Sequence, residues 1–128
     1  MMTKLILNNT KNCPLPGGHY SHSCTVGHLI FISGQLPITK DGLKLNNTSF
    51  EEQTKLVLLN LDESLIGAGT TRERLVQVRV YITHMHQWPT FNDLYSAWIG
   101  NHRPTRAVAS VSELHYGSAI EIEAVAAV

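Results

Sequence analysis

The sequence predicts an α+β fold, a mixed β-sheet with two helices packed on one of its faces. Segments with the two-residue alternation of strands are interrupted by two segments with helical periodicity, in the order β–β–α–β–α–β–β. A pair of helices can cover only one face of such a sheet. The chain has 128 residues, 43% hydrophobic and 16% charged, which fits one globular domain over residues 1–128.

The first third of the chain is predicted to be irregular around one short strand. Residues 8–18 are rich in Asn, Pro and Gly and are interpreted as a lead-in segment. Residues 27–33 form a short strand with bulky apolar side chains on both faces. Residues 34–37 interrupt it. Residues 39–42 are predicted to form a tight turn, because the pair Asp41-Gly42 favours one.

A first helix is predicted to begin at residues 49–52, where Ser-Phe-Glu-Glu matches a capping box. Apolar side chains then recur at helical spacing: Phe50, Val57, Leu58, Leu61 and Leu65. Gly67 or Gly69 is expected to end the helix.

Residues 74–83 alternate in the manner of a strand, with four β-branched side chains expected on one face: Val76, Val78, Val80 and Ile82. Pro89 suits the first turn of a second helix, and Gly100 is expected to end it. Its apolar stripe consists of Phe91, Leu94, Tyr95, Trp98 and Ile99.

Residues 106–111 and 118–127 are predicted to form the last two strands. Ile120, Ile122, Ala124 and Ala126 share one face of the final strand, opposite Glu121, Glu123 and Val125. Carboxylates on a largely apolar strand are unfavourable unless they are paired. Arg106 is therefore expected to pair with one of these acids, or to bind an acidic ligand that it flanks together with Glu121.

The sheet face away from the helices is too apolar for solvent and too polar for a closed core. It carries Leu29, Phe31, Tyr81, Glu121 and Val125. Faces of this composition form subunit interfaces. The sequence therefore predicts a homo-oligomer with charged residues near its seam.

Composition argues against several classes of protein. Ten basic and ten acidic side chains give a net charge of zero, which lacks the electrostatic footprint of a nucleic-acid binder. No stretch approaches the ~20 apolar residues of a membrane-spanning helix, and the N-terminus lacks the apolar region of a secretory signal. We therefore expect a cytoplasmic protein with no nucleic-acid or membrane partner, whose Cys13 and Cys24 are free thiols. The histidine pairs 19/22 and 84/86 lack a third ligand for zinc, so no metal is expected.

A series of short segments occurs in an order and spacing typical of one family. They are Tyr20-Ser21, the run Phe-Ile-Ser-Gly-Gln-Leu-Pro at 31–37, Glu52-Gln53-Thr54, Val80-Tyr81-Ile82-Thr83, Asn92 with Tyr95, Pro104-Thr105-Arg106, and residues 121–124. This set resembles the YjgF/RidA family of reactive-intermediate (enamine/imine) deaminases. The resemblance implies a chorismate-mutase-like fold and a homotrimer whose three active sites lie between neighbouring subunits.

The resemblance also implies a hydrolase of the 2-iminobutanoate/2-iminopropanoate deaminase type. Such enzymes convert 2-aminoacrylate, 2-iminopropanoate and 2-iminobutanoate to 2-oxoacids and ammonia without a cofactor. Arg106 would clamp the substrate carboxylate, and Glu121 would orient or deprotonate the attacking water. Tyr20 and Ser33 would position substrate or water, Asn92 would support the site, and the backbone near Val108 would contact the substrate nitrogen.

Several alternatives stay open at this point. Arg106 and Glu121 can also be interpreted as a structural ion pair, and Glu123 as a seam residue. The segments Gly18-His19-Tyr20-Ser21-His22 and His115-Tyr116-Gly117 depart from the family pattern, which leaves the roles of His19, His22, His115 and Tyr116 undecided. The substrate can be a larger enamine acid of the aminomuconate type, or the protein can be a non-catalytic trimeric binding module for carboxylate metabolites. A ribonuclease activity ranks last because the net charge is zero.

Overall fold

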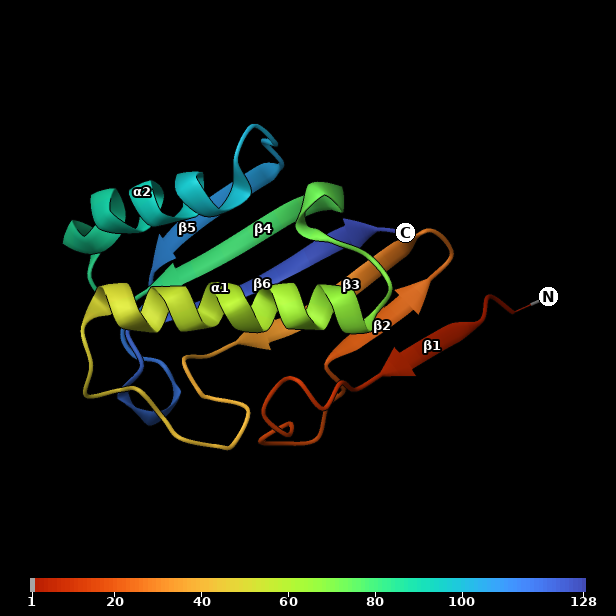
Figure 1. The fold of residues 1–128 in the computed structure, drawn as a ribbon, viewed down its shortest axis with the longest axis horizontal. Helices are drawn as coiled ribbons and strands as arrows, with labels where there is room; N and C mark the ends of the chain where they lie inside the picture. Colours follow the sequence, from red (N-terminus) through yellow and green to blue (C-terminus); the bar gives the residue numbers. More distant parts are fainter. Residues whose placement is uncertain (1) are drawn as a thin grey trace.

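The computed structural model describes residues 2–128 and has the predicted α+β architecture, with two helices on one face of a six-stranded mixed sheet (Figure 1). The strands are β1 (Leu5–Asn8), β2 (Ser23–Val26), β3 (Leu29–Gln35), β4 (Leu75–Ile82), β5 (Thr105–Ser110) and β6 (Ile120–Ala127). The helices are α1 (Phe50–Gly67) and α2 (Trp88–Ile99), with short 3-10 turns at η1 (Arg72–Arg74), η2 (Met85–Gln87) and η3 (His115–Gly117).

The sheet has the order β1-β2-β3-β6-β4-β5. Its pairs are antiparallel except β4–β5, which are parallel and are joined by a crossover through α2. The C-terminal strand β6 therefore lies in the middle of the sheet, between β3 and β4, while β5 lies at one edge. This placement decides where the candidate functional residues lie.

The core lies between the helices and the sheet. Ser49 caps α1 as predicted, because its Oγ accepts a hydrogen bond from the backbone N–H of Glu52 at 3.1 Å. The five apolar residues predicted for α1 are all buried. The same holds for the predicted inward face of β6, Ile120, Ile122, Ala124 and Ala126. The two predicted helices and the last strand are thus confirmed.

The N-terminal part differs from the prediction, because three strands precede α1, whereas the predicted order has two and assigns residues to only one of them, at 27–33. The short strands β1 and β2 were missed, and β2 and β3 form a hairpin around Gly27, whose φ is 58°. The predicted turn at 39–42 is present, with the Gly42 N–H donating to the Thr39 carbonyl at 2.8 Å. An isolated bridge, Ile38–Lys44, stands beside that turn in place of a strand.

One face assignment in β4 was wrong. Val76 was expected to point inward with Val78, Val80 and Ile82, yet its side chain is 44% exposed. The pairing of β4 with β6 shifts between Leu75 and Gln77, which is a β-bulge. The extra residue reverses the alternation, so that Leu75 takes the inward position and Val76 turns outward.

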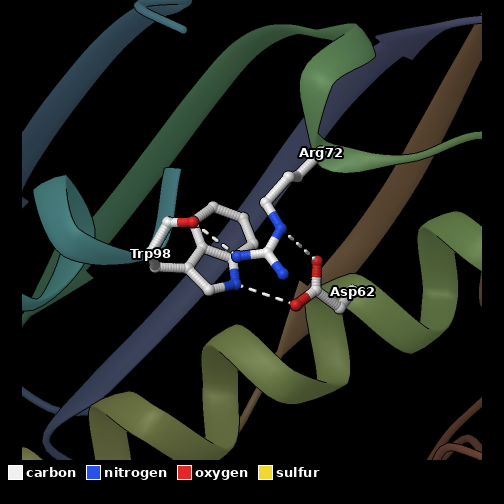
Figure 2. A network of polar contacts seen from close by, with 3 residues as sticks. All are labelled: Asp62, Arg72 and Trp98. Carbon is white, nitrogen blue, oxygen red and sulfur yellow. Dashed lines mark hydrogen bonds and ion pairs between the residues drawn. The ribbon is translucent and has the colours of Figure 1, made fainter. Parts of the chain in front are cut away.

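A polar cluster fixes the two helices relative to each other (Figure 2). Asp62 on α1 accepts a hydrogen bond from Nε1 of Trp98 on α2 at 2.8 Å. Its other carboxylate oxygen lies 3.3 Å from Nε of Arg72 in η1. The Arg72 guanidinium also stacks over the Trp98 ring, 5.0 Å from its centroid, and donates to the Trp98 carbonyl. The cluster therefore ties α2 to α1.

The sheet face opposite the helices is uncovered in the single chain. Leu29 and Phe31 of β3 are 40% and 45% exposed there. Apolar exposure of this size on one sheet face is the basis of the predicted oligomer, which stays a prediction. Within residues 2–128, no helix is long and apolar enough to cross a membrane.

Candidate active site

A β-bulge in β3 creates the floor of the main candidate site. Ile32 pairs with Ala124 and Gln35 with Ile122, so β3 has one more residue than β6 over this stretch. The extra residue lies at Ser33–Gly34, opposite Glu123 of β6. A Cβ atom at Gly34 would lie 2.1 Å from Oε2 of Glu121. The Glu121 carboxylate thus rests directly on the backbone at Gly34, and no side chain larger than hydrogen fits between them.

A cavity of about 720 Å³ opens above this floor. Its lining includes three of the predicted site residues, Tyr20, Ser33 and Glu121, together with His115 and Tyr116. Ser33 Oγ donates to the Ser21 carbonyl at 2.7 Å, which fixes the serine side chain. Tyr20 Oη accepts from the N–H of Gly17 at 3.2 Å. The structure therefore brings the residues predicted to handle water into one cavity.

The surroundings of Glu121 make its carboxylate more basic than usual. Burial raises the pKa of Glu121, and the neighbouring charge of Glu123 raises it further, while His115 acts in the opposite direction. A raised pKa brings a carboxylate closer to the range in which it takes up a proton from water efficiently. The site accordingly places a candidate general base at the bulge.

Glu123, two residues further on, has structural partners. Its Oε1 accepts a hydrogen bond from Tyr81 Oη at 2.7 Å and lies 3.4 Å from Nη1 of Arg79. The hydrogen bond to Glu123 is the main reason why the pKa of Tyr81 is raised. These contacts favour the interpretation of Glu123 as a residue that organises the open face of the sheet.

A second group of predicted residues lies at the β5 edge. Arg106 Nη1 donates to Oδ1 of Asn92 at 2.9 Å. Its guanidinium stacks against two rings of α2, 5.0 Å from the centroid of Tyr95 and 5.6 Å from that of Phe91. These contacts hold a cation beside a cavity of about 520 Å³, whose lining includes Arg103 but no acidic residue. The arrangement suits a carboxylate ligand.

Sequence reasoning missed the part that α2 plays in holding Arg106. Of the residues on that helix, only Asn92 is predicted from the sequence to belong to the site, and the aromatic contacts depend on how α2 crosses β5. Burial raises the pKa of Tyr95, and the positive charge of Arg106 opposes that effect. The Tyr95 hydroxyl is buried and has no hydrogen-bond partner among residues 2–128. It is therefore a free polar group next to the guanidinium.

The Glu121 cavity and the Arg106 cluster at the β5 edge do not meet within one chain. Arg106 pairs with Val78 of β4, and Val78 pairs with Ala124 of β6, so β4 lies between them. With strands about 4.8 Å apart and about 3.3 Å per residue, the Cα atoms of Arg106 and Glu121 are roughly 14 Å apart. Arg106 also faces the helices, whereas Glu121 faces the open side. The expected pairing of Arg106 with Glu121 or Glu123 is therefore absent from the described chain, where Glu123 pairs with Arg79.

Val108 lies on β5, two residues beyond Arg106, and its side chain packs against the core. Only its backbone is then available for the predicted contact with a substrate nitrogen. Within the described residues, β5 pairs only with β4, so its other edge has unpaired backbone groups.

His22, whose role was undecided, is a buried structural residue. Its Nδ1 accepts from the N–H of Thr10 at 3.0 Å, and its Nε2 lies 2.8 Å from the Pro14 carbonyl. These partners require a neutral imidazole with the proton on Nε2. The backbone N–H of His22 donates to Asn9 Oδ1 at 2.8 Å. His22 thus fastens the lead-in segment that forms the rim of the larger cavity.

Gly34, at the bulge beneath Glu121, is a position that sequence reasoning left unassigned. A glycine inside a strand is a known signal of a bulge or of a close approach. Nothing in the sequence indicates which side chain makes that approach. Within residues 2–128, no three His, Cys, Asp or Glu side chains gather closely enough to hold a metal ion.

Comparisons with known proteins agree with this geometry. The sequence model of a family described as Endoribonuclease L-PSP matches residues 10–128. Protein HMF1 of Saccharomyces cerevisiae is 32% identical over 127 residues, which is 99% of this chain and 98% of the yeast protein. The mitochondrial protein mmf2 of Schizosaccharomyces pombe is 35% identical over 130 residues, covering 98% of this chain and 99% of its own.

Solved structures match the fold over almost its whole length. RidA from the Antarctic bacterium Psychrobacter superposes with a TM-score of 0.92 and 27% identity, covering 96% of this chain and 99% of RidA. Escherichia coli TdcF with bound serine gives a TM-score of 0.90 and 26% identity, covering 96% and 98%. The fold thus places the chain in the class of small α+β proteins to which these relatives belong. The chain belongs to the YjgF/RidA family, as the sequence motifs indicated. The cytoplasmic location expected from the sequence stays a prediction, since one relative is named as mitochondrial.

Proposed function

We propose that this protein hydrolyses small 2-imino acids and their enamine tautomers to 2-oxoacids and ammonia, as one RidA-like domain acting in a homotrimer. The observation that carries the proposal is the division of the site. One chain holds a basic carboxylate over a bulge and, separately, a guanidinium at an edge strand. A three-carbon imino acid is about 5 Å long and cannot contact both groups of one chain, because the sheet itself lies between the two side chains. The active site therefore combines the Glu121 cavity of one subunit with the Arg106 edge of its neighbour.

The chemistry assigned to each group follows from its surroundings. The Arg106 guanidinium binds the substrate carboxylate with two parallel hydrogen bonds, because its orientation is already set by Asn92 and the α2 rings. Glu121 takes a proton from a water molecule, whose oxygen then bonds to C2 of the imine. The nitrogen takes up the proton that Glu121 removed from water, which gives a carbinolamine. The carbinolamine hydroxyl then loses its proton and forms the C2=O bond of the 2-oxoacid while the carbon–nitrogen bond breaks, and the nitrogen leaves as ammonia with that second proton, passed through Glu121 or solvent. Orientation and proton transfer are sufficient for this reaction.

A second candidate function is supported by one neighbour. TdcF is a relative solved with bound serine, which supports the binding of small carboxylate metabolites. A cleft that binds such metabolites without turning them over is therefore the second candidate. A larger enamine acid as substrate is the remaining enzymatic alternative. The nuclease activity in the family description has little support here, because the chain carries ten basic and ten acidic side chains.

The test is complementation between two inactive variants. Arg106→Ala and Glu121→Gln are each expected to lose at least ~10²-fold in kcat/KM in an assay that couples an amino-acid oxidase to imine hydrolysis. When the two are unfolded together and refolded at equal amounts, about a quarter of the shared sites receive both wild-type groups. Activity should then return to about a quarter of the wild-type value. Arg74→Ala, at an exposed arginine outside both cavities, is the matched control and should behave as wild type.

Three outcomes count against parts of the proposal. No recovery on mixing would mean that Arg106 and Glu121 do not share a site between subunits. Wild-type rates for Arg106→Ala would show that Arg106 does not bind the substrate carboxylate. A protein that binds 2-oxoacids but turns over no imine would be a binding module. Light scattering at micromolar concentration adds a direct check, because a monomer is incompatible with the proposed site.

A further inference from the structure

Tyr116 has an unfavourable backbone conformation and lines the same cavity as the proposed catalytic acid. Its φ is 62° and its ψ is 21°, and it is the only non-glycine residue with positive φ among residues 2–128. Left-handed backbone conformations are disfavoured for bulky side chains and are usually occupied by glycine, as in Gly117 at φ 71°. A large residue held in this way is a reason to look for function.

The Tyr116 side chain connects three segments around the cavity that contains Glu121. Lys44 Nζ lies 4.6 Å from the centroid of its ring, and the His115 ring lies 5.8 Å away. Its hydroxyl would be 3.2 Å from a Cβ atom at Gly17. The tyrosine thus reaches from the turn that carries Lys44 to the lead-in segment, and 44% of its surface remains exposed. It forms part of the outer wall of the cavity.

We propose that Tyr116 determines which substrates the site accepts, by limiting the length of the substrate side chain. The proposal rests on the function proposed above. The C2 atom of a 2-imino acid carries a carboxylate, a nitrogen and a side chain. The carboxylate lies on Arg106 and the nitrogen lies at the reacting centre near Glu121. The substrate side chain is then the part whose length the cavity wall restricts. Tyr116 is held by its backbone turn and by Lys44, so it forms a wall of fixed position.

The test compares substrates that differ only in side-chain length. Tyr116→Gly removes the wall and also suits the left-handed backbone, so the variant is expected to fold. Tyr116→Phe keeps the ring and the same backbone conformation and serves as the matched control. The imines of alanine and leucine are generated by an amino-acid oxidase, and kcat/KM is measured for each. Since one methylene in an apolar pocket changes discrimination by ~10-fold or more, the leucine-to-alanine ratio should rise at least ~10-fold in Tyr116→Gly and stay unchanged in Tyr116→Phe.

A binding measurement separates the failure of this inference from failure of the proposed function. Dissociation constants for pyruvate and 4-methyl-2-oxopentanoate are measured by calorimetry on the same three proteins. If wild type hydrolyses the alanine imine and Tyr116→Gly leaves the ratio unchanged, the inference is wrong and the proposed function stands. If no imine is hydrolysed, the proposed function fails. The binding ratio then decides the inference: a ~10-fold shift toward the longer acid in Tyr116→Gly supports it, and an unchanged ratio overturns it.

Discussion

Replacing Gly34 with alanine tests whether the Glu121 carboxylate acts from the position that the structure gives it. The new Cβ would lie 2.1 Å from Oε2, whereas contacts under 3.0 Å are essentially never observed, so the carboxylate must retreat by about 1 Å. It is the free end of a flexible side chain and can do so without unfolding the sheet. A displacement of this size in a catalytic group lowers rates by about 10²-fold. We expect Gly34→Ala to lose about 10²-fold in kcat with a nearly unchanged melting temperature.

The matched control for this variant is Gly18→Ala, which lies on the same cavity. A Cβ there would meet the Tyr20 ring at 3.7 Å, an ordinary van der Waals contact. That variant should keep wild-type kcat. Both rates come from the oxidase-coupled assay and both stabilities from thermal melts followed by circular dichroism. Wild-type kcat for Gly34→Ala, with the fold intact, would falsify the assignment of Glu121 as the group that acts at the bulge.

Two further predictions concern charged side chains. Burial raises the folded-state pKa of Glu121 above its unfolded value, so its contribution to stability is present at low pH and is lost as pH rises through the folded pKa. Urea midpoints of Glu121→Gln should therefore exceed those of wild type at pH 7 and match them near pH 4. The kcat/KM of wild type should fall as pH drops through the raised pKa of Glu121. Asp62→Ala leaves the Trp98 N–H and Arg72 without their acceptor, which costs about 1–3 kcal/mol. Thermal melts should show a clear loss for Asp62→Ala, a smaller one for Asp62→Asn, which keeps an acceptor oxygen, and none for the neighbouring Glu63→Ala.

The long elements of the fold were predictable because their periodicity is strong. The helix α1 and the strand β6 bury the residues that the pattern indicated, and α2 buries Phe91, Tyr95 and Ile99 and leaves Leu94 and Trp98 half-buried. The strands β1 and β2 have four residues each, too few for alternation to stand out from a loop. The bulge at Leu75–Gln77 was also hidden, because an extra residue becomes visible only when the partner strand is known.

The candidate site was predictable in its residue types but not in its arrangement. Arg106 and Glu121 stood out because charges on apolar strands need partners. Which face an edge strand turns toward the helices depends on its register with β4, and that register placed Arg106 on the side opposite Glu121. The support of Arg106 by α2 and the backbone of Tyr116 depend on tertiary contacts that no local pattern encodes.

The bulge in β3 also limits how this protein can change during evolution. Ile32 and Gln35 are both buried although they are three residues apart, because the extra residue between them resets the alternation. Deleting one residue at Ser33–Gly34 would remove the bulge and restore regular alternation, with Gln35 still facing inward but without the backbone on which Glu121 rests. Inserting one residue would enlarge the bulge and displace that backbone. The floor of the cavity can therefore vary only by substitution. The loops that form its rim carry no such constraint, so differences in loop length are the available route to new substrates.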